Sequence, residues 1–409
     1  MGERALRIGV AGLGRAFAIM LPTLRAHPRI TVAAAADPRE AARRQFAEDF
    51  QGAAYASVEA LCADPRVDAV YIASPHDFHV AHATIAARAG KHVLVEKPMA
   101  LTLAECDAMI DATRAAGVCL IVGHSHSFDA PVLRARALIA GGAYGRVRMI
   151  TALNFTDYLY RPRRPEELDT ARGGGAVYNQ AAHQVDVVRM LAGSRATSVR
   201  AAAGAWDAAR PTEGAYTAFM SFDDGVAASL TYSGYAHFDS DEFCGWIGEL
   251  GHPVDRTRYG TARAALAAAS SPPAELALKT ARNYGSVPAA VPPPAAHNQF
   301  GLVIASCEHA DLRPLPNGVM VYDDRGEHLD ALPAPVIPRA EVIDELCDAV
   351  AGVRSPVHTG EWGRATLEAC LAILQSSREG REIALRRQVD VGALPGAPMP
   401  TGAGGVSTC

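Results

Sequence analysis

Lys97 stands where a basic side chain could act on a substrate. It follows a strand-like apolar segment in HVLVEKPMALT, directly after Glu96. In an open α/β sheet, ligands bind beyond the carboxyl ends of the strands. A lysine there can donate a hydrogen bond to a substrate hydroxyl and lower the pKa of that hydroxyl through its positive charge. The position therefore predicts either a proton-handling lysine or, as the alternative, a solvated residue at a strand end.

His183 lies within GGGAVYNQAAHQVDVVRML, which has the apolar spacing of a helix. One helical stripe is apolar and comprises Val177, Ala181, Val185, Val188 and Leu191. Asn179, His183 and Asp186 fall on roughly the opposite side, at i+3 and i+4 spacing. Apolar residues border this polar side, so the helix could be covered on both faces. The pattern predicts that His183 faces a ligand or a second domain.

A glycine-rich turn, Gly12-Leu13-Gly14, lies between the first predicted strand and the first predicted helix. Glycines allow a tight turn and let a pyrophosphate approach the main-chain N–H groups at a helix N-terminus. Phe17 stands where the GxGxxG pattern has its third glycine, which implies slightly different packing of the strand on the helix. We expect Gly12, Gly14, Arg15 and Phe17 to belong to a dinucleotide site.

Asp37 ends the second predicted strand, about two dozen residues after the turn. A carboxylate at this place can accept hydrogen bonds from the adenosine ribose hydroxyls, which favours NAD. Arg39 follows closely, so NADP remains the alternative.

Further cofactor contacts are expected at the ends of two later strands. In IASPHDFH, Ser74, Pro75 and His76 could line the nicotinamide side, whereas His79 begins the next helix and is assigned to the same site. Glu96 and Lys97 end the strand that follows and complete the expected cofactor set.

Four arginines precede the helix that carries His183, namely Arg161, Arg163, Arg164 and Arg172. Guanidinium groups bind carboxylates with two parallel hydrogen bonds, so a substrate with one or two carboxylates would explain this cluster. A basic solvated loop is the alternative, because PEELD supplies local counter-charges.

The order of predicted elements divides the chain. Strands within 6–14, 30–38, 67–75, 92–98 and 118–124 alternate with helical segments, which predicts a doubly wound parallel sheet over 1–122. Residues 146–238 contain successive strands, including a hairpin in MSFDDGVAASL, and helices return over 341–379. We expect an α+β domain with a large, mostly antiparallel open sheet over 123–390. A Pro-rich excursion over 270–296 and a disordered tail over 391–409 complete the prediction.

Composition excludes several classes of protein. The chain has 409 residues and a net charge of −5, with no basic surface for nucleic acid and no apolar run long enough to span a membrane. Eight cysteines are scattered without a CxxC pair, which predicts reduced thiols in the cytoplasm and neither a disulfide framework nor a metal site.

The sequence resembles the Gfo/Idh/MocA family of NAD(P)-dependent oxidoreductases. The segments that carry the resemblance are GVAGLGRAF, AAADP, ASPHDFH, GKHVLVEKPMALT, LIVGHSHSFDAPVLRARALIAGGAYGRV, GGGAVYNQAAHQVDVVRML and RATLEACLAILQSSREGREIAL. The resemblance implies a Rossmann domain and a C-terminal domain whose open sheet often forms the interface of a homodimer or homotetramer.

The family's catalytic lysine and histidine fall on Lys97 and His183, so the resemblance implies that His183 is a general base facing the nicotinamide. Where the family has DxGxH, this chain has Asn179-Gln180-Ala181-Ala182-His183, and either Asn179 or Asp186 would orient the imidazole. Asn179 could also bind substrate. GHSHSF departs from the usual Gly-x-Asn-x-Arg-Phe and offers His126 as a further substrate contact.

The arginine-rich segment and the variant before His183 resemble the branch of the family that oxidises the cis-dihydrodiol of phthalate in aromatic catabolism. The function implied is hydride transfer to NAD(P) from a carbinol carbon of a cyclic diol, with 4,5-dihydro-4,5-dihydroxyphthalate as the candidate substrate. A sugar or inositol dehydrogenase is the alternative within the family. A non-catalytic NAD(P)-sensing protein is the alternative from another class, and the joint presence of Lys97 and His183 counts against it.

Overall fold

The first half of the fold is a six-stranded sheet in the computed structural model, which describes residues 4–257, 259–269, 271–286 and 293–391. Its strands are β1 (Leu6–Ala11), β2 (Ile30–Ala36), β3 (Ala53–Tyr55), β4 (Ala69–Ile72), β5 (His92–Val95) and β6 (Leu120–Val122). All neighbours pair in parallel, in the order β3-β2-β1-β4-β5-β6. This is the doubly wound order of a dinucleotide-binding domain, so the predicted fold class is confirmed.

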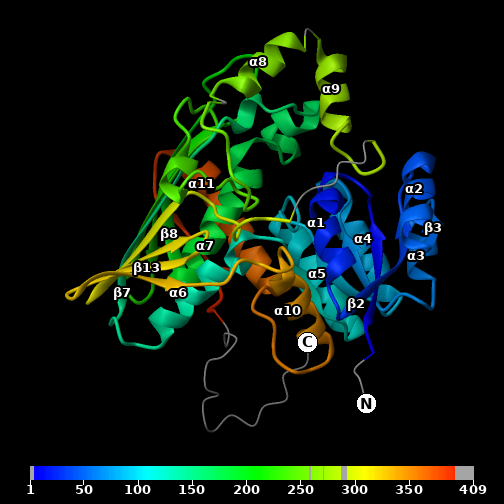
Figure 1. Ribbon diagram of the computed structural model, residues 1–409, viewed down its shortest axis with the longest axis horizontal. Coiled ribbons are helices and arrows are strands. Elements are labelled where there is room, and N and C mark those ends of the chain that lie inside the picture. Colours follow the sequence, from blue (N-terminus) through cyan, green and yellow to red (C-terminus); the bar gives the residue numbers. More distant parts are fainter. Residues whose placement is uncertain (1–3, 258, 270, 287–292, 392–409) are drawn as a thin grey trace.

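Helices cover both faces of this sheet (Figure 1). They are α1 (Arg15–Ala26), α2 (Glu40–Phe50), α3 (Val58–Cys62), α4 (His79–Arg88) and α5 (Leu103–Ala116). Local sequence sets their ends; α5, for example, begins with a capping box between Thr102 and Glu105 and ends at Gly117 in the left-handed conformation. Each face has its own buried apolar cluster.

A helix from near the C-terminus completes one of these two clusters. α10 (Ala340–Val350) buries Val342, Ile343 and Leu346 in the cluster that also contains Ile8 and Phe17 of the first domain. The segment therefore packs with residues 1–122, although the expected second domain included it. Its apolar spacing predicted a helix but could not show which domain that helix would cover.

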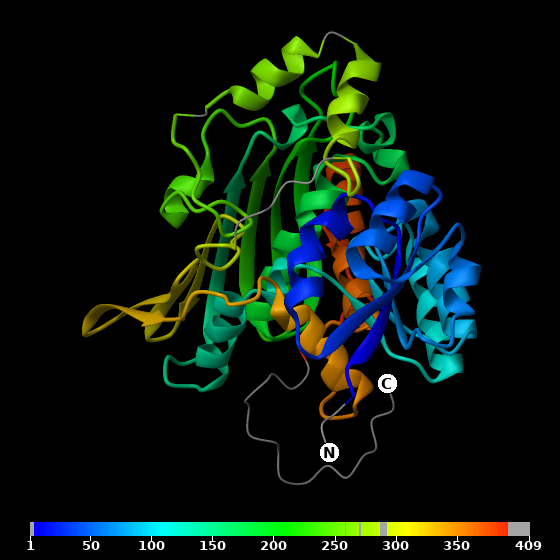
Figure 2. The same ribbon diagram turned by 45° about the vertical axis from the view of Figure 1, so that its right-hand side comes forward.

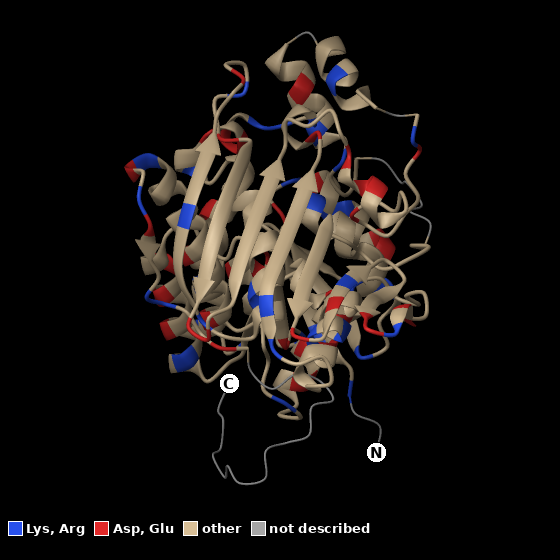
Figure 3. Cartoon of the chain, turned by 90° about the vertical axis from the view of Figure 1, so that its left-hand side faces the viewer, with Lys and Arg blue, Asp and Glu red and all other residues tan. Residues whose placement is uncertain are grey.

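The second half of the chain builds a nine-stranded sheet. Its strands are β7 (Val147–Phe155), β8 (Ala196–Gly204), β9 (Ala215–Phe222), β10 (Ala227–Ser233), β11 (Leu302–Cys307), β12 (Ala310–Leu315), β13 (Gly318–Asp323), β14 (Gly326–Ala331) and β15 (Ile383–Ala384). The order is β14-β13-β12-β11-β7-β10-β9-β8-β15, and every pair is antiparallel except β7 with β10. The predicted hairpin joins β9 to β10. The outer face of this sheet is mostly uncharged (Figure 3).

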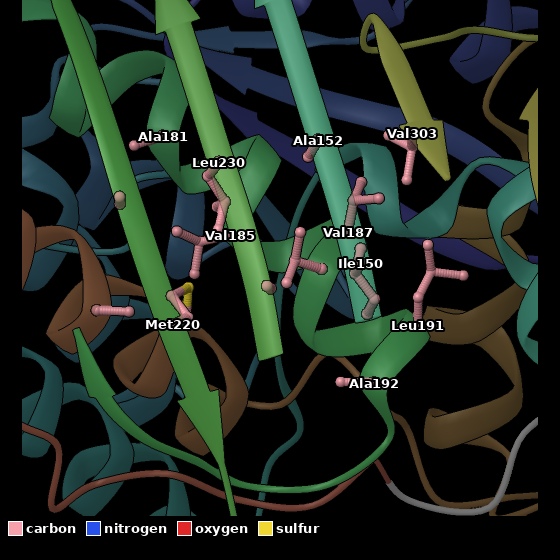
Figure 4. Packing of buried hydrophobic residues seen from close by; sticks show 14 of the residues in the cluster. Ile150, Ala152, Ala181, Val185, Val187, Leu191, Ala192, Met220, Leu230 and Val303 are labelled. Atoms are coloured by element: carbon pink, nitrogen blue, oxygen red, sulfur yellow. The ribbon is translucent and has the colours of Figure 1, made fainter. Parts of the chain in front are cut away.

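The segment with His183 lies against the inner face of this sheet. It starts with a π-helical turn (Val177–Ala181) and continues as α7 (Ala182–Ala192), every residue of which is buried. Val185, Val187 and Leu191 of α7 pack against strand residues such as Ile150 and Leu230 (Figure 4). α6 (Ala130–Ala140) packs beside α7. Apolar packing therefore holds the helix that presents His183.

α11 (Gly360–Glu379) links the two halves. It contacts β8 on one side and α5 on the other, and it runs between the large sheet and the first domain (Figure 2). A helix buried along most of its length between two layers fixes their separation, and hence the position of anything held between them.

The predicted excursion over 270–296 carries α9 (Pro272–Thr280), which lies above the first domain in Figure 1, and α8 (Thr261–Ala268) precedes it in the segment that follows β10. Tyr284 anchors it: its ring packs edge-on against Phe17 with centroids 4.9 Å apart, and its hydroxyl donates to Asp49 at 2.7 Å. Parts of the excursion (270 and 287–292) and nearly all of the predicted tail (392–409) lie outside the described residues.

Candidate active site

A cleft of about 960 Å³ lies beyond the carboxyl ends of the parallel strands, where the first domain faces α7 and the excursion. Lys97, His183 and the glycine turn, which are far apart in sequence, all line it. A cleft at this edge of a doubly wound sheet is where such folds bind nucleotides.

The glycine turn leaves main chain uncovered at the start of α1. Gly12 has φ +98°, and a Cβ there would lie 2.8 Å from the Ser74 nitrogen and 2.9 Å from the Ala73 carbonyl carbon. Gly14 is the N-cap of α1, and Arg15 follows it in the lining. These residues fit a pyrophosphate, because the N-terminus of a helix and small residues let an anion approach the backbone.

Phe17, also predicted to belong to this site, is fully buried beneath the turn. Its ring contacts Phe46, Phe50 and Tyr284 in the core of the first domain. Phe17 therefore anchors the first turn of α1 to the core of its domain, and it is absent from the described lining of the cleft. The sequence pattern showed its position in the turn but not the direction of its side chain.

Asp37 lines the far end of the cleft. Its carboxylate accepts hydrogen bonds from the Leu13 amide at 2.8 Å and from the main-chain and Nε nitrogens of Arg39, both at 2.9 Å. These bonds hold a negative charge beside the glycine turn, where ribose hydroxyls can donate to it, while Arg39 is already engaged. The arrangement fits NAD.

The predicted cofactor residues after β4 differ in whether they reach the cleft. Ser74, Pro75 and His76 line the cleft as predicted. His79 is fully buried, and its ring nitrogens lie 3.1 Å from the Pro98 carbonyl oxygen and 3.0 Å from that of Ser74. It ties the loop after β4 to the loop after β5, outside the described lining, so it positions cofactor-binding loops without touching the cleft.

Lys97 points its ammonium at the segment that carries His183. Its Nζ donates to the main-chain oxygen of Asn179 at 2.6 Å. Burial lowers the pKa of Lys97, and the carboxylates of Glu96 and Glu249 oppose that shift. Glu96 accepts a hydrogen bond from Tyr71 at 2.5 Å, and burial raises its pKa. The lysine is therefore a half-buried donor at the junction of the two domains.

His183 is buried at the same junction, and its Nδ1 has no hydrogen-bond partner among the described residues. Burial lowers its pKa well below the usual value, and the charge of Lys97 adds to the effect. The imidazole is therefore neutral and able to accept a proton.

Neither predicted orienting residue bonds to His183. Asp186 accepts from Ser127 at 2.5 Å and from Thr366 at 2.7 Å, which uses it to tie helices together. The Asn179 amide donates to the main-chain oxygens of Gly173 and Gly175, so it shapes the turn before α7. Helical spacing predicted proximity to His183, but closer partners take both side chains.

The neighbour of His183 is instead His126, with ring centroids 4.7 Å apart. His126 lies 2.6 Å from Asp129 through Nδ1 and 3.4 Å from Glu249 through Nε2. Burial alone would lower the pKa of His126, but these two carboxylates raise it to about 9. Sequence reasoning missed Asp129 and Glu249. Asp129 stands three residues after His126, whereas nothing in the sequence around Glu249 marks it.

The four predicted arginines divide into two pairs. Arg163 and Arg164 line the cleft, whereas Arg161 bonds to Asp157 at 2.8 Å and Arg172 is exposed, both outside the described lining. The excursion adds Lys279, which sequence reasoning missed and which donates to Glu167 at 2.7 Å. Seven basic and five acidic side chains line the cleft, so its charge favours an anionic ligand.

A doubly wound domain with a glycine turn, an acid directly after β2 and a lysine and a histidine in the same cleft is typical of NAD-binding oxidoreductases. Residues 6–124 match the oxidoreductase family with an NAD-binding Rossmann fold, and residues 132–252 match the GFO/IDH/MocA C-terminal domain. The chain belongs to the Gfo/Idh/MocA family and is an NAD-dependent dehydrogenase. No helix among the described residues is long and apolar enough to cross a membrane.

The chain is similar to several dehydrogenases in sequence and in structure. A 1-carboxy-3-chloro-3,4-dihydroxycyclohexa-1,5-diene dehydrogenase from Comamonas testosteroni is 50% identical over 377 residues, covering 91% of this chain and 95% of that protein. A trans-1,2-dihydrobenzene-1,2-diol dehydrogenase from Danio rerio is 33% identical over 46% of this chain and 56% of its own length. A solved structure from Bordetella bronchiseptica RB50, described as a dehydrogenase, superposes with a TM-score of 0.88 at 42% identity, covering 93% of this chain and all of that one.

Proposed function

We propose that this dehydrogenase oxidises a carboxylated cyclohexadiene cis-diol with NAD, with 4,5-dihydro-4,5-dihydroxyphthalate as the particular candidate. The observation that carries the proposal is the meeting of Lys97 and His183 in one cleft that also holds Arg163 and Arg164. The relative from Comamonas testosteroni supports it, because its name describes a substrate with one carboxylate on a dihydroxycyclohexadiene.

In the proposed mechanism, a diol hydroxyl lies between Lys97 and His183. His183 accepts the hydroxyl proton, and Lys97 donates a hydrogen bond to the same oxygen as negative charge develops there. The nicotinamide, when bound, would be the acceptor of the hydride that leaves the carbinol carbon. The resulting ketone enolises to a catechol, and aromatisation makes the overall oxidation favourable.

Carboxylate recognition is assigned to the basic side chains of the lining. Arg163 stacks on the Tyr158 ring, with its guanidinium carbon 3.6 Å from the centroid, and donates to the Tyr158 main-chain oxygen at 2.7 Å. Arg164 lies beside it, 3.2 Å from Glu166. Because Arg163 is held in place, we assign the main contact with the substrate carboxylate to Arg164.

Replacing Arg164 by Gln is expected to raise KM for a carboxylated cis-diol by about 10- to 100-fold while kcat changes little, because the lost contact binds substrate and transition state alike. Steady-state NAD reduction measures both constants. Arg172→Gln, in the exposed arginine of the same segment, is the control. Equal KM values in the two variants would contradict the assignment.

A substrate panel tests the function itself. NAD reduction is measured with the cis-dihydrodiol of phthalate, a monocarboxylated chlorinated cis-diol, an uncarboxylated cis-diol, myo-inositol and aldoses. We expect turnover with a carboxylated diol and much less with the others. Turnover confined to inositol or aldoses would replace the proposal with a sugar dehydrogenase, and NAD binding without turnover of any compound would indicate a sensor.

We also propose a homodimer or homotetramer formed through the outer face of the large sheet, where Met149 is 51% and Phe219 50% exposed. Light scattering after gel filtration is expected to show two or four chains per particle. Phe219→Glu should shift the particle toward one chain, and an unchanged mass would place the interface elsewhere.

A further inference from the structure

Three side chains of types that commonly bind metal ions lie close together in the lining of the cleft. One ligand atom from each of His126, His183 and Glu249 lies within 4.8 Å of the other two. His126 Nε2 and Glu249 Oε1 are 3.4 Å apart, close to the separation of about 3.3 Å between two ligands on a tetrahedral zinc ion with bonds of about 2.0–2.1 Å. The three residues come from separate segments of the chain, so their meeting is a property of the fold.

Neighbouring groups orient His126 toward Glu249 and leave one ring nitrogen of His183 without a hydrogen bond from the described residues. Asp129 lies 2.6 Å from Nδ1 of His126, which leaves Nε2 directed at Glu249. Such a carboxylate–histidine pair fixes the ring of a metal ligand and increases its basicity. His183 is 5% exposed, and no hydrogen bond from the described residues holds its Nδ1. Its ring packs against His126 and Phe300, with centroids 4.7 and 5.1 Å away, and an ion bound at Nδ1 would displace no hydrogen bond from the described residues.

The local charges are compatible with an added ion. Glu249 and Asp129 contribute two negative charges, whereas Lys97, Arg161 and Arg339 are the basic groups that act on the cluster. Lys97 is bonded to the Asn179 main-chain oxygen and Arg161 to Asp157. A set of two imidazoles and one carboxylate suits Zn²⁺, Fe²⁺ and Co²⁺ better than Mg²⁺ or Ca²⁺.

We propose that His126, His183 and Glu249 bind one divalent transition-metal ion, for which Zn²⁺ and Co²⁺ are the probes. Binding of the ion uses a lone pair of His183 and places the ion where the diol would lie. Zn²⁺ is therefore an inhibitor of the dehydrogenase that a chelator reverses. This inhibition rests on the proposed function, whereas the binding of the ion does not.

The test is a titration of the full-length, chelator-treated protein with Co²⁺, followed by visible absorption and equilibrium dialysis. One Co²⁺ per chain is expected, with the intense visible bands of a low-coordinate site. Glu249→Gln should weaken binding by at least about tenfold. Glu242→Gln, at an exposed glutamate in the same segment between β10 and α8, should leave binding unchanged. Equal affinity in the Glu249 and Glu242 variants, or no saturable binding by the wild-type protein, would overturn the proposal.

A second measurement guards against a variant that folds poorly. Zn²⁺ should raise the thermal midpoint of the wild-type protein and of Glu242→Gln, because a ligand of the native state stabilises it, but not that of Glu249→Gln. A rise of the same size in all three proteins would also overturn the site. Neither measurement needs substrate, so both test the metal site even if the protein proves to oxidise no diol.

Discussion

Turnover of a carboxylated cis-diol is expected to fall by about 10²- to 10⁴-fold when Lys97 is replaced by Met. The reason is the position of Nζ, which lies in the cleft lining and bonds to the segment just before His183. Methionine fills a similar volume, so the lost charge, rather than a cavity, accounts for the effect. Steady-state kcat measures the loss, and calorimetric titration with NAD separates it from any loss of cofactor binding.

His183→Asn should reduce kcat over the same range, and the double variant should be little worse than either single one, because donor and base act on one oxygen. The control is Lys91→Met at the other end of β5, where Nζ donates to the main-chain oxygens of Asp64 and Val67, far from the glycine turn and from His183 in the lining of the cleft. Full turnover in either active-site variant, or an equal loss in Lys91→Met, would refute the proposed roles.

The second large effect is expected at the glycine turn. Gly12→Ala should weaken NAD binding by at least about 100-fold. The new Cβ would meet the main chain of Ser74 and Ala73 at 2.8–2.9 Å, which forces the turn away from the position that suits a pyrophosphate. Calorimetric titration with NAD measures the change directly, without any assumption about the substrate.

Gly90→Ala is the matched control, because Gly90 also has positive φ (+70°) but a Cβ there would have nothing within 4 Å. Gly90→Ala should lose about 1–2 kcal/mol of stability from the left-handed backbone, and Gly12→Ala should lose more because of the added clash, as thermal unfolding would show. Only Gly12→Ala should lose NAD affinity. If the two variants bind NAD equally well, the glycine turn is not the phosphate site.

The sequence predicted those parts of the protein that local patterns determine. Alternating strands and helices predicted the parallel sheet, and the Asp-Gly turn predicted the β9–β10 hairpin. The strand end placed Lys97 at the ligand-binding edge of the sheet, whereas the expectation that His183 would meet it there came from the resemblance to the family. Of the four clustered arginines, Arg163 and Arg164 line the cleft.

The remaining features depend on side-chain direction and on contacts between distant segments. Phe17 lies in the first turn of α1 and His79 begins α4, next to the expected cofactor site, but the side chain of each is buried. Asp186 has the spacing to reach His183 but bonds to Ser127 and Thr366, partners far away in sequence. Glu249 is 123 residues from His126, and no periodic pattern connects them.

The return of α10 to the first sheet means that the amino-terminal unit is not continuous in the gene. A fragment ending near residue 122 would lack Val342, Ile343 and Leu346, which in the intact chain complete the buried cluster that contains Ile8 and Phe17. Chimeras that exchange cofactor preference between relatives would therefore need to carry residues 340–350 together with the amino-terminal part. Otherwise the recombined halves would meet at an apolar surface shaped for a different helix.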